Sequence, residues 1–225
     1  MAEILNRRFE IPREQLEESI QRGLNRNHDE YNMVIPLRDV KSVEDMTFVR
    51  QDVLEALLRA IPLRNSEEKI FPYAQASIEM YGIEPKGLAV GQTFVLKEKL
   101  LGIMTSMSSV FKEYATKGLS KMPPAQVYGR DETGGKVMAF YIPPVVEYHN
   151  GRAVLLDGMH RSFICSSAGT TINGIHLRMI SAPLPFDEVT WKDVSVVDQK
   201  PPIDQRYKNL DQRYFRDLTA VGIDG

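Results

Sequence analysis

Five consecutive residues combine an acid, a glycine, an imidazole and a guanidinium in the order Asp157-Gly158-Met159-His160-Arg161. Glycine lets the backbone approach a ligand closely or take a positive φ. Aspartate can cap a helix or hold a divalent ion that bridges phosphates. Arginine offers a planar fork of donors to phosphate oxygens, and histidine can donate to a phosphate or transfer a proton. The segment has the chemistry expected of a phosphate-binding turn.

The flanking sequence predicts the elements that position this segment. Asn-Gly between two extended runs is a strong signal for a β-hairpin, and here it is Asn150-Gly151. The expected elements are extended runs at 141–148 and 153–156, a short helix at about 160–168 closed by Gly169, and a strand at 173–180.

A tight turn from a strand into a helix points the first backbone amides of the helix into open space, where they favour an anion. Asp-Gly before a helix is also a common turn and cap, and His160 and Arg161 could be solvated. The residues alone therefore leave a phosphate site and a structural turn as two open interpretations.

Residues 141–180 resemble the core of the ParB/sulfiredoxin-like superfamily. The resemblance rests on Pro-Pro-Val-Val, a hairpin with Gly151, the run from Leu155 to Arg161, a helix that reaches Ala168-Gly169, and a final strand. Members of this superfamily include ParB-type CTP-hydrolysing partition proteins, sulfiredoxins, some nucleases and nucleotide-dependent kinases of free serine. The resemblance implies that phosphate binds at this turn and helix start.

Departures from the pattern favour the kinases of free serine. Sulfiredoxins have a cysteine directly before the His-Arg pair, where this chain has Met159. ParB proteins carry a glutamate and arginines where this chain has Met159, His160 and Phe163, and no helix-turn-helix follows the core. The one cysteine, Cys165, is expected to be a buried structural thiol.

The kinases of free serine use a glutamate shortly after the first strand as catalytic base. Glu14, Glu17 and Glu18 stand in roughly that place, and Glu147 is a further acidic candidate. A carboxylate beside the phosphates could accept the proton of an attacking hydroxyl, although each of these glutamates could equally be a surface charge.

The site expected from these considerations has catalytic, cofactor-binding and metal-binding parts. The catalytic candidates are Glu17, Glu18, Asp157 and His160. The nucleotide, ATP or ADP with CTP as a further possibility, would bind at Asp157, Gly158, Met159, His160, Arg161 and Ser162, and Asp157 would hold Mg²⁺. The adjacent residues His28-Asp29-Glu30 are a weaker metal candidate and could be a solvated loop.

The remaining chain predicts an α+β fold, in which a small mixed sheet with the phosphate turn and short helix carries a helical insertion. Expected are a strand at 8–12, a helix at 13–24, a strand at 33–37, a helix from Ser42 to Ile61, a helix from Ser66 to about Gly82, a helix from Leu96 to Lys117, and extended residues at 125–128. We treat this as a single domain with its core at about 1–40 and 123–197, a helical insertion at 42–118 and a polar tail at 198–225.

The tail repeats Asp-Gln-Arg-Tyr at 204–207 and 211–214, a spacing that puts both copies on one face of a helix. Such a face could be solvated, could dock a partner, or could contact nucleic acid. The helical insertion could supply specificity, a lid or a homodimer interface.

The 225 residues include 43% hydrophobic residues, which is ordinary for a globular protein. Their net charge of −2 counts mildly against a dedicated DNA-binding protein. No stretch approaches the roughly 18 apolar residues of a membrane span. No apolar run follows the charges of residues 1–8, so no signal peptide is expected, and we expect a cytoplasmic protein.

Three hypotheses of function follow. The first is a nucleotide-dependent phosphotransferase that acts on a small hydroxylated metabolite such as an amino acid. The second is a ParB-like nucleotide-binding protein or nuclease associated with DNA. The third is a non-catalytic module that binds a nucleotide or phosphate and contacts other proteins.

Overall fold

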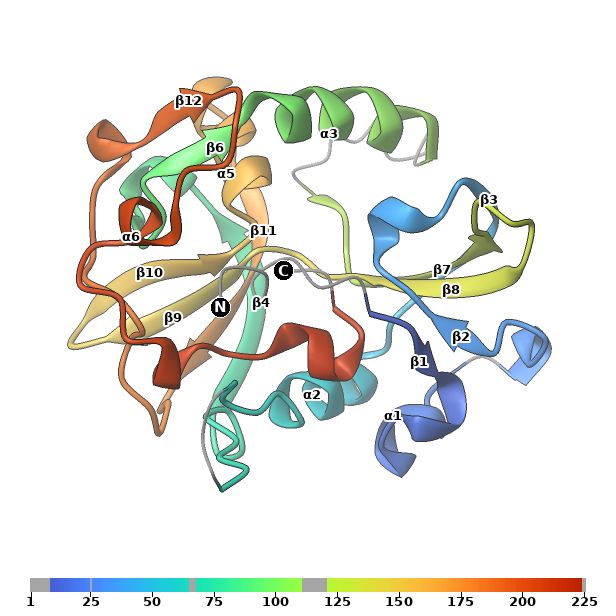
Figure 1. Cartoon of the computed structure of the whole chain (residues 1–225). Helices are drawn as coiled ribbons and strands as arrows, with labels where there is room; N and C mark the ends of the chain where they lie inside the picture. The colour runs from blue at the N-terminus through green and yellow to red at the C-terminus, as the bar shows by residue number, and fades with distance from the viewer. Residues whose placement is uncertain (1–8, 25, 65–67, 111–120, 224–225) are drawn as a thin grey trace. The chain divides into compact units, whose positions relative to one another are not determined.

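The computed structural model is an α+β fold in which small mixed sheets combine with few helices (Figure 1). It describes residues 9–24, 26–64, 68–110 and 121–223. The chain divides into two compact units, each of which we describe by itself: unit 1 holds residues 1–74, 123–142 and 216–225, and unit 2 holds residues 75–122 and 143–215. None of the helices in the described ranges has the length and apolar character needed to span a bilayer.

Unit 1 is built on a five-stranded sheet with the order β1-β2-β8-β7-β3. Its strands are β1 (Ile11–Pro12), β2 (Met33–Val34), β3 (Ser42–Phe48), β7 (Ala125–Arg130) and β8 (Lys136–Tyr141), and its α-helices are α1 (Glu18–Gln21) and α2 (Gln51–Arg59). The apolar face of α2 is buried through Val53, Leu54, Leu57 and Leu58, so burial of this stripe stabilises the helix on its unit.

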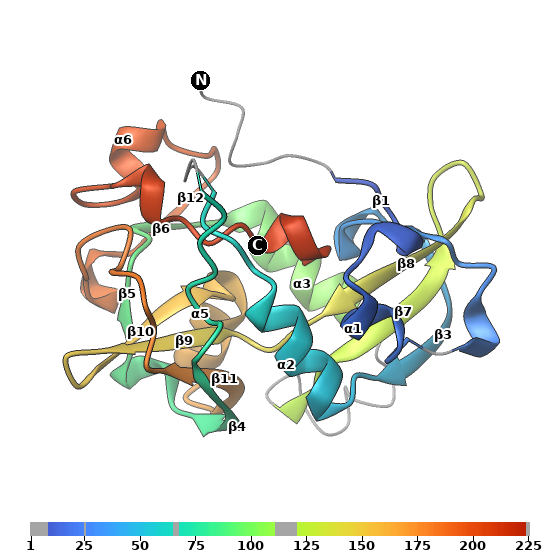
Figure 2. The same ribbon diagram turned by 90° about the horizontal axis from the view of Figure 1, so that it is seen from below.

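Unit 2 is built on a second five-stranded sheet with the order β4-β11-β9-β10-β5. Its strands are β4 (Ser77–Ile83), β5 (Ala89–Val90), β9 (Val145–His149), β10 (Arg152–Asp157) and β11 (Ile172–Arg178), and a parallel pair is formed by β6 (Phe94–Leu96) and β12 (Ser195–Val197). The α-helices are α3 (Lys97–Val110), α5 (Met159–Ser167) and α6 (Ile203–Arg206). Strands β10, β9 and β11 run side by side in both views (Figure 1 and Figure 2).

The elements predicted around the candidate turn are confirmed, except that the run expected at 141–148 is divided between Tyr141, which ends β8, and β9 at Val145–His149. Strands β9 and β10 form an antiparallel hairpin, and Asn150 and Gly151 both take positive φ, at 49° and 79°. The short helix is α5, Gly169 follows its end with a φ of 64°, and β11 is the final strand. This part of the chain follows its local signals because turn residues and alternation agree with each other.

The helical insertion expected at 42–118 is wrong. Residues 42–48 form β3 rather than the start of a helix, and α2 begins only at Gln51. Residues 77–83 form β4 where we expected a helix from Ser66 to about Gly82. Both segments contain β-branched or aromatic residues. β4 pairs with β11 along its whole length, and β3 pairs with β7 except at an irregularity between Val43 and Asp45, so sheet pairing overrides the helical spacing of their apolar residues.

The other helical predictions hold in part. The helix expected from Leu96 to Lys117 is α3, which starts at Lys97 and is described to Val110; residues 111–118 lie outside the described residues. The helix expected at 13–24 is reduced to a 3-10 turn at Arg13–Gln15 and the one-turn α1. The strands expected at 8–12 and 33–37 are present as the two-residue β1 and β2.

The repeat in the tail does not lie on one helix, contrary to our expectation. Its first copy falls on α6 and the extended residue Tyr207, and its second on a 3-10 turn at Gln212–Tyr214. Tyr207 instead stacks on Phe186 with ring centroids 5.3 Å apart and meets Phe215 edge-on at 5.4 Å. This part of the tail is therefore packed onto its own unit by aromatic contacts.

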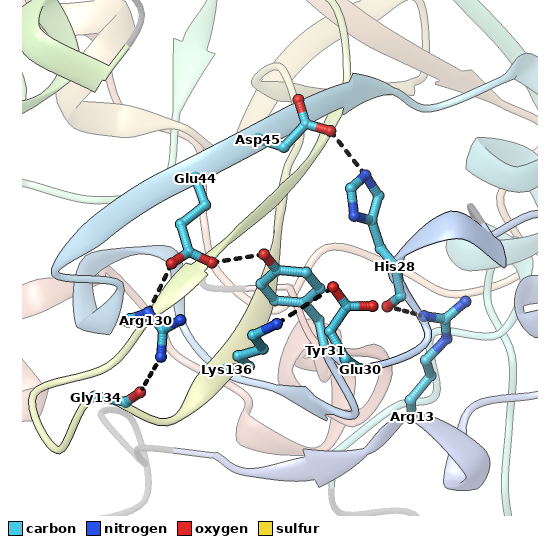
Figure 3. Close-up of polar contacts among 9 residues, drawn as sticks. All are labelled: Arg13, His28, Glu30, Tyr31, Glu44, Asp45, Arg130, Gly134 and Lys136. Carbon is cyan, nitrogen blue, oxygen red and sulfur yellow. Dashed lines mark hydrogen bonds and ion pairs between the residues drawn. The ribbon is translucent and has the colours of Figure 1, made fainter.

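A polar network crosses the sheet of unit 1 (Figure 3). Tyr31 donates its hydroxyl hydrogen bond to Glu44 at 2.6 Å, and Arg130 donates to the other oxygen of Glu44 at 2.6 Å and to the Gly134 carbonyl at 2.8 Å. The Tyr31 hydroxyl and the Arg130 guanidinium lower the pKa of Glu44, while the bond to Glu44 and burial raise the pKa of Tyr31 to about 12. The network ties β3 to the β7–β8 hairpin and to the segment before β2.

Replacing Glu44 by glutamine tests this network through the pH dependence of unfolding. Because folding lowers the pKa of Glu44, the Glu44 carboxylate adds to the free energy of unfolding above its ordinary pKa of 4.5, and this stabilisation is lost as the pH falls. Because folding raises the pKa of Tyr31, the stabilisation from the Tyr31 hydroxyl is lost as the pH rises from 10 to about 12. Glu44→Gln should be less stable at neutral pH. In urea unfolding measured across the pH range, its free energy of unfolding should change less steeply with pH in both the acidic and the alkaline window.

Glu18→Gln is the matched control, because Glu18 pairs with Arg22 at an exposed helix surface where an ion pair contributes little. Equal losses in the two variants at neutral pH would contradict a stabilising role of the Glu44 network.

Candidate functional site

The turn between β10 and α5 depends on Gly158. Its φ of 84° and ψ of 23° lie in the left-handed region. A Cβ at this position would lie 2.7 Å from both Cβ and Cγ of Pro144, which directly precedes β9. Two features therefore disfavour a side chain at position 158: the left-handed backbone conformation and the close approach of Pro144.

Gly158 is also the N-cap residue of α5, and it offers no side chain to the helix. Within the described part of the chain, no side-chain hydrogen bond caps this helix end. Met159 is 7% exposed and packs against Val90, Val146 and Leu155, which fixes the first turn of α5 on the sheet. The first-turn amides and the positive end of the helix dipole are thus held at a rigid position.

Asp157 and Arg161 face each other across this turn. Arg161 Nη2 lies 3.2 Å from Asp157 Oδ2, and the two side chains are only 13% and 11% exposed. Burial raises the pKa of Asp157, while the Arg161 guanidinium and a hydrogen bond from the Gly158 amide oppose that rise. The carboxylate therefore holds the guanidinium beside the start of α5.

His160 makes a contact that the sequence did not predict. Its Nε2 accepts a hydrogen bond of 3.0 Å from the backbone amide of Leu96, the last residue of β6. Burial, assisted by the positive charges of Lys99, Arg161 and Lys200, lowers the pKa of His160 to about 4. The ring is neutral at pH 7 with its proton on Nδ1, so Nδ1 is the atom left for donation to a ligand.

Two further cations approach this turn, and both were missed in the sequence. Lys99 on α3 acts on the charges of Asp157 and His160, and Lys200, which follows β12, acts on His160. α3, α5 and β6 pack against one another within unit 2, as Figure 1 shows. Lys99 lies 58 positions before Asp157 in the sequence, so only the fold brings the positive charges together.

Ser162, the last of the predicted binding residues, is fully buried. Its backbone amide donates to the Gly158 carbonyl at 2.9 Å. Its Oγ has no hydrogen-bond partner among the residues that the structure describes, which leaves a buried hydroxyl unsatisfied.

The predicted catalytic glutamates lie in the other unit. Glu17 and Glu18 are exposed residues of unit 1, where Glu17 precedes α1 and Glu18 pairs with Arg22, while residues 157–162 belong to unit 2. Glu147 differs from both because it is fully buried, with its Oε2 2.6 Å from Nε2 of His149.

The candidate metal ligands His28, Asp29 and Glu30 form ion pairs within unit 1. His28 pairs with Asp45 at 2.7 Å, Asp29 with Arg13 at 3.2 Å and Glu30 with Lys136 at 3.4 Å, so the three neighbours point to three different partners. Groups of three or more His, Cys, Asp or Glu suited to a metal are absent from the described ranges. Cys165 is buried as expected, and burial raises the pKa of its thiol.

The chain matches no protein-family model, no curated protein and no solved structure. The geometry of the β10–α5 turn is therefore the basis for any functional assignment.

Gly158→Ala tests the constraint on the turn. We expect it to lower the free energy of unfolding by about 2–5 kcal/mol, because left-handed strain and overlap with Pro144 add. Gly169→Ala is the matched control: Gly169 also has a positive φ, but a Cβ there meets no atom within 4 Å. It should cost only about 1–2 kcal/mol in urea unfolding. Equal costs would show that Pro144 imposes no constraint.

His160→Leu tests the neutral histidine. A His whose pKa is lowered by folding contributes stability that is present above its ordinary value of 6.5 and is lost as the pH falls toward about 4. In His160→Leu, the free energy of unfolding should therefore fall less steeply between pH 6.5 and about 4 than in the wild-type chain. The pKa of His176 is lowered by burial as well, so part of the fall should remain. An unchanged slope would contradict a lowered pKa of His160 in the folded protein.

Proposed function

We propose that the β10–α5 turn binds the phosphates of a nucleotide and that the protein is a nucleotide-dependent phosphotransferase for a small hydroxylated metabolite such as an amino acid. The observation that carries the proposal is the convergence on one helix start of uncapped amides, Gly158 and an arginine held by a buried carboxylate. A glycine at the helix start allows phosphate oxygens to approach the amides, and the guanidinium offers them a second set of donors.

The charge around the turn favours a ligand with several negative charges. Arg161, Lys99 and Lys200 supply three cations, whereas Asp157 is the carboxylate of the turn and is engaged with Arg161. A di- or triphosphate, which carries several negative charges, would interact with these cations more strongly than a monophosphate. ATP and ADP are the first candidates, and CTP is a third.

A magnesium ion fits this site as a companion of the phosphates rather than as an ion held by a protein cage. Mg²⁺ commonly uses one or two carboxylates together with substrate phosphates. Asp157 is the residue that would contribute a carboxylate oxygen. When bound, the ion would neutralise charge on the phosphates.

The chemical step requires a hydroxyl oxygen of the acceptor to attack the terminal phosphorus, while the bond from phosphorus to the leaving phosphate oxygen breaks. Arg161 and the amides of α5 would stabilise the negative charge on the phosphate oxygens. The proton of the hydroxyl must pass to a base. Of the catalytic candidates, Asp157 and His160 lie at the turn, whereas Glu17 and Glu18 belong to unit 1.

Binding is tested by thermal shift with ATP, ADP and CTP, each with and without magnesium. The wild-type chain should be stabilised by at least one nucleotide, and Arg161→Lys should weaken that stabilisation because lysine lacks the planar fork. Arg161→Ala leaves Asp157 buried without its partner, so Asp157→Asn combined with Arg161→Gln is the variant that separates binding from folding. Arg152→Ala is the control, since Arg152 is 75% exposed on the neighbouring strand β10.

Turnover is tested by transfer of labelled phosphate from the bound nucleotide to free amino acids and polyols. Transfer that fails in Arg161→Lys supports the phosphotransferase. Binding without transfer or hydrolysis would indicate the non-catalytic module, and salt-sensitive retention on DNA would indicate the DNA-associated protein. Absence of any nucleotide effect would contradict the proposal.

A further inference from the structure

A second cluster lies on the sheet of unit 2, formed by Tyr81 on β4, Tyr148 on β9, and His176 and Arg178 on β11. The register places Tyr81 opposite Gly174, and His176 opposite Val146. Because side chains alternate along a strand, Tyr81, Tyr148, His176 and Arg178 emerge on one face of the sheet. None of these residues belongs to the β10–α5 turn.

The Tyr81 ring is fixed by a fully buried histidine. The rings of Tyr81 and His176 are stacked, with centroids 3.5 Å apart and planes at 3°. His176 is held in turn by its two ring nitrogens, which lie 3.2 Å from the Tyr148 hydroxyl and 3.3 Å from the Tyr81 carbonyl oxygen. Tyr81 is nevertheless 38% exposed, so part of its side chain is open to solvent although one face of the ring rests on His176.

The hydroxyl group of Tyr81 is held equally firmly. It lies 2.9 Å from the Tyr148 hydroxyl and accepts a hydrogen bond of 3.2 Å from Arg178. An aromatic ring with both its face and its hydroxyl fixed loses little conformational entropy when a ligand stacks on it.

Arg178 adds a positive charge beside this ring. Its guanidinium lies 3.7 Å from the centroid of Tyr148, and among the described residues it forms no ion pair with a carboxylate. Glu79, opposite His176 on the same face, is the nearest acid in the register and is not bonded to Arg178. Four of the five guanidinium donors remain without a protein partner in this part of the chain.

We propose that Tyr81 and Arg178 bind a nucleobase that carries a phosphate, with the base stacked on the outer face of Tyr81 and the phosphate on Arg178. A rigid aromatic ring next to a guanidinium that keeps unused donors is the combination that recognises a base together with its backbone phosphate. The ligand is either a free nucleotide or a nucleotide within a single-stranded nucleic acid. The site does not rest on the function proposed for the β10–α5 turn.

Binding is tested by calorimetry with AMP and by fluorescence anisotropy with a labelled single-stranded oligonucleotide. Both titrations use the Arg161→Lys background, in which the turn is weakened, so that failure of this proposal is distinguishable from failure of the phosphotransferase proposal. Binding of AMP assigns a free nucleotide, and binding of the oligonucleotide alone assigns a nucleic-acid strand.

Tyr81→Leu should weaken binding about 5- to 150-fold, which corresponds to loss of one base–aromatic stack. Tyr81→Phe should retain most of the affinity because the ring remains, and Arg178→Gln should weaken binding without removing the ring. Met80→Ala is the matched control, since Met80 is 39% exposed on the same strand and points to the opposite face.

Within the Arg161→Lys background, equal affinity with and without Tyr81→Leu would overturn the proposal, as would no binding of either probe at millimolar concentration. If Tyr81→Leu does not fold, Arg178→Gln decides alone: unchanged affinity for both probes overturns the proposal.

Discussion

The left-handed conformation of Gly158 is the constraint on which unit 2 depends. This conformation turns the chain from β10 into α5 at a single residue. Pro144 lies so close to Gly158 that only the hydrogen of a glycine fits there. The turn lets Met159 enter the apolar cluster with Val146 and Leu155 while the next two residues stay at the helix start. A residue with a side chain would have to move either the helix or the strand before it.

The electrostatics of the turn follow from this geometry. Asp157 is buried, so its carboxylate needs a compensating cation, and Arg161 one turn later supplies it. His160 is turned to the amide of Leu96 and remains neutral, which links the start of α5 to the end of β6. The interaction places α3, which begins at the next residue, where Lys99 adds to the positive charge of the turn. Structural contacts and the proposed phosphate site therefore use the same residues.

Local signals were sufficient to predict the region from β9 to β11. Asn150, Gly151, Gly158 and Gly169 are turn residues that local signals identify, and all four take the positive φ that such turns require. β3 and β4 could not be predicted in this way. Their apolar residues fit a helical spacing, and only the partner strands, which are far away in the sequence, decide that they become strands.

The same distinction applies to the candidate site. The order of residues predicts that Asp157 and Arg161 share the turn, but not that they pair, because Asp157 is the last residue of β10 and lies outside α5. It does not predict Lys99, Lys200 or the contact of His160 with Leu96, which depend on tertiary packing. The pair formed by Tyr81 and Arg178 was missed for the same reason, since β4 was taken for a helix.

Phosphate binding at the start of α5 can be followed at single residues through the backbone amide resonances of the ¹⁵N-labelled protein during titration with ADP and magnesium. If the phosphates bind there, the amides of Met159, His160 and Arg161 show the largest shifts, and these shifts saturate together. Saturating shifts confined to other residues, with these three amides unchanged, would contradict phosphate binding there.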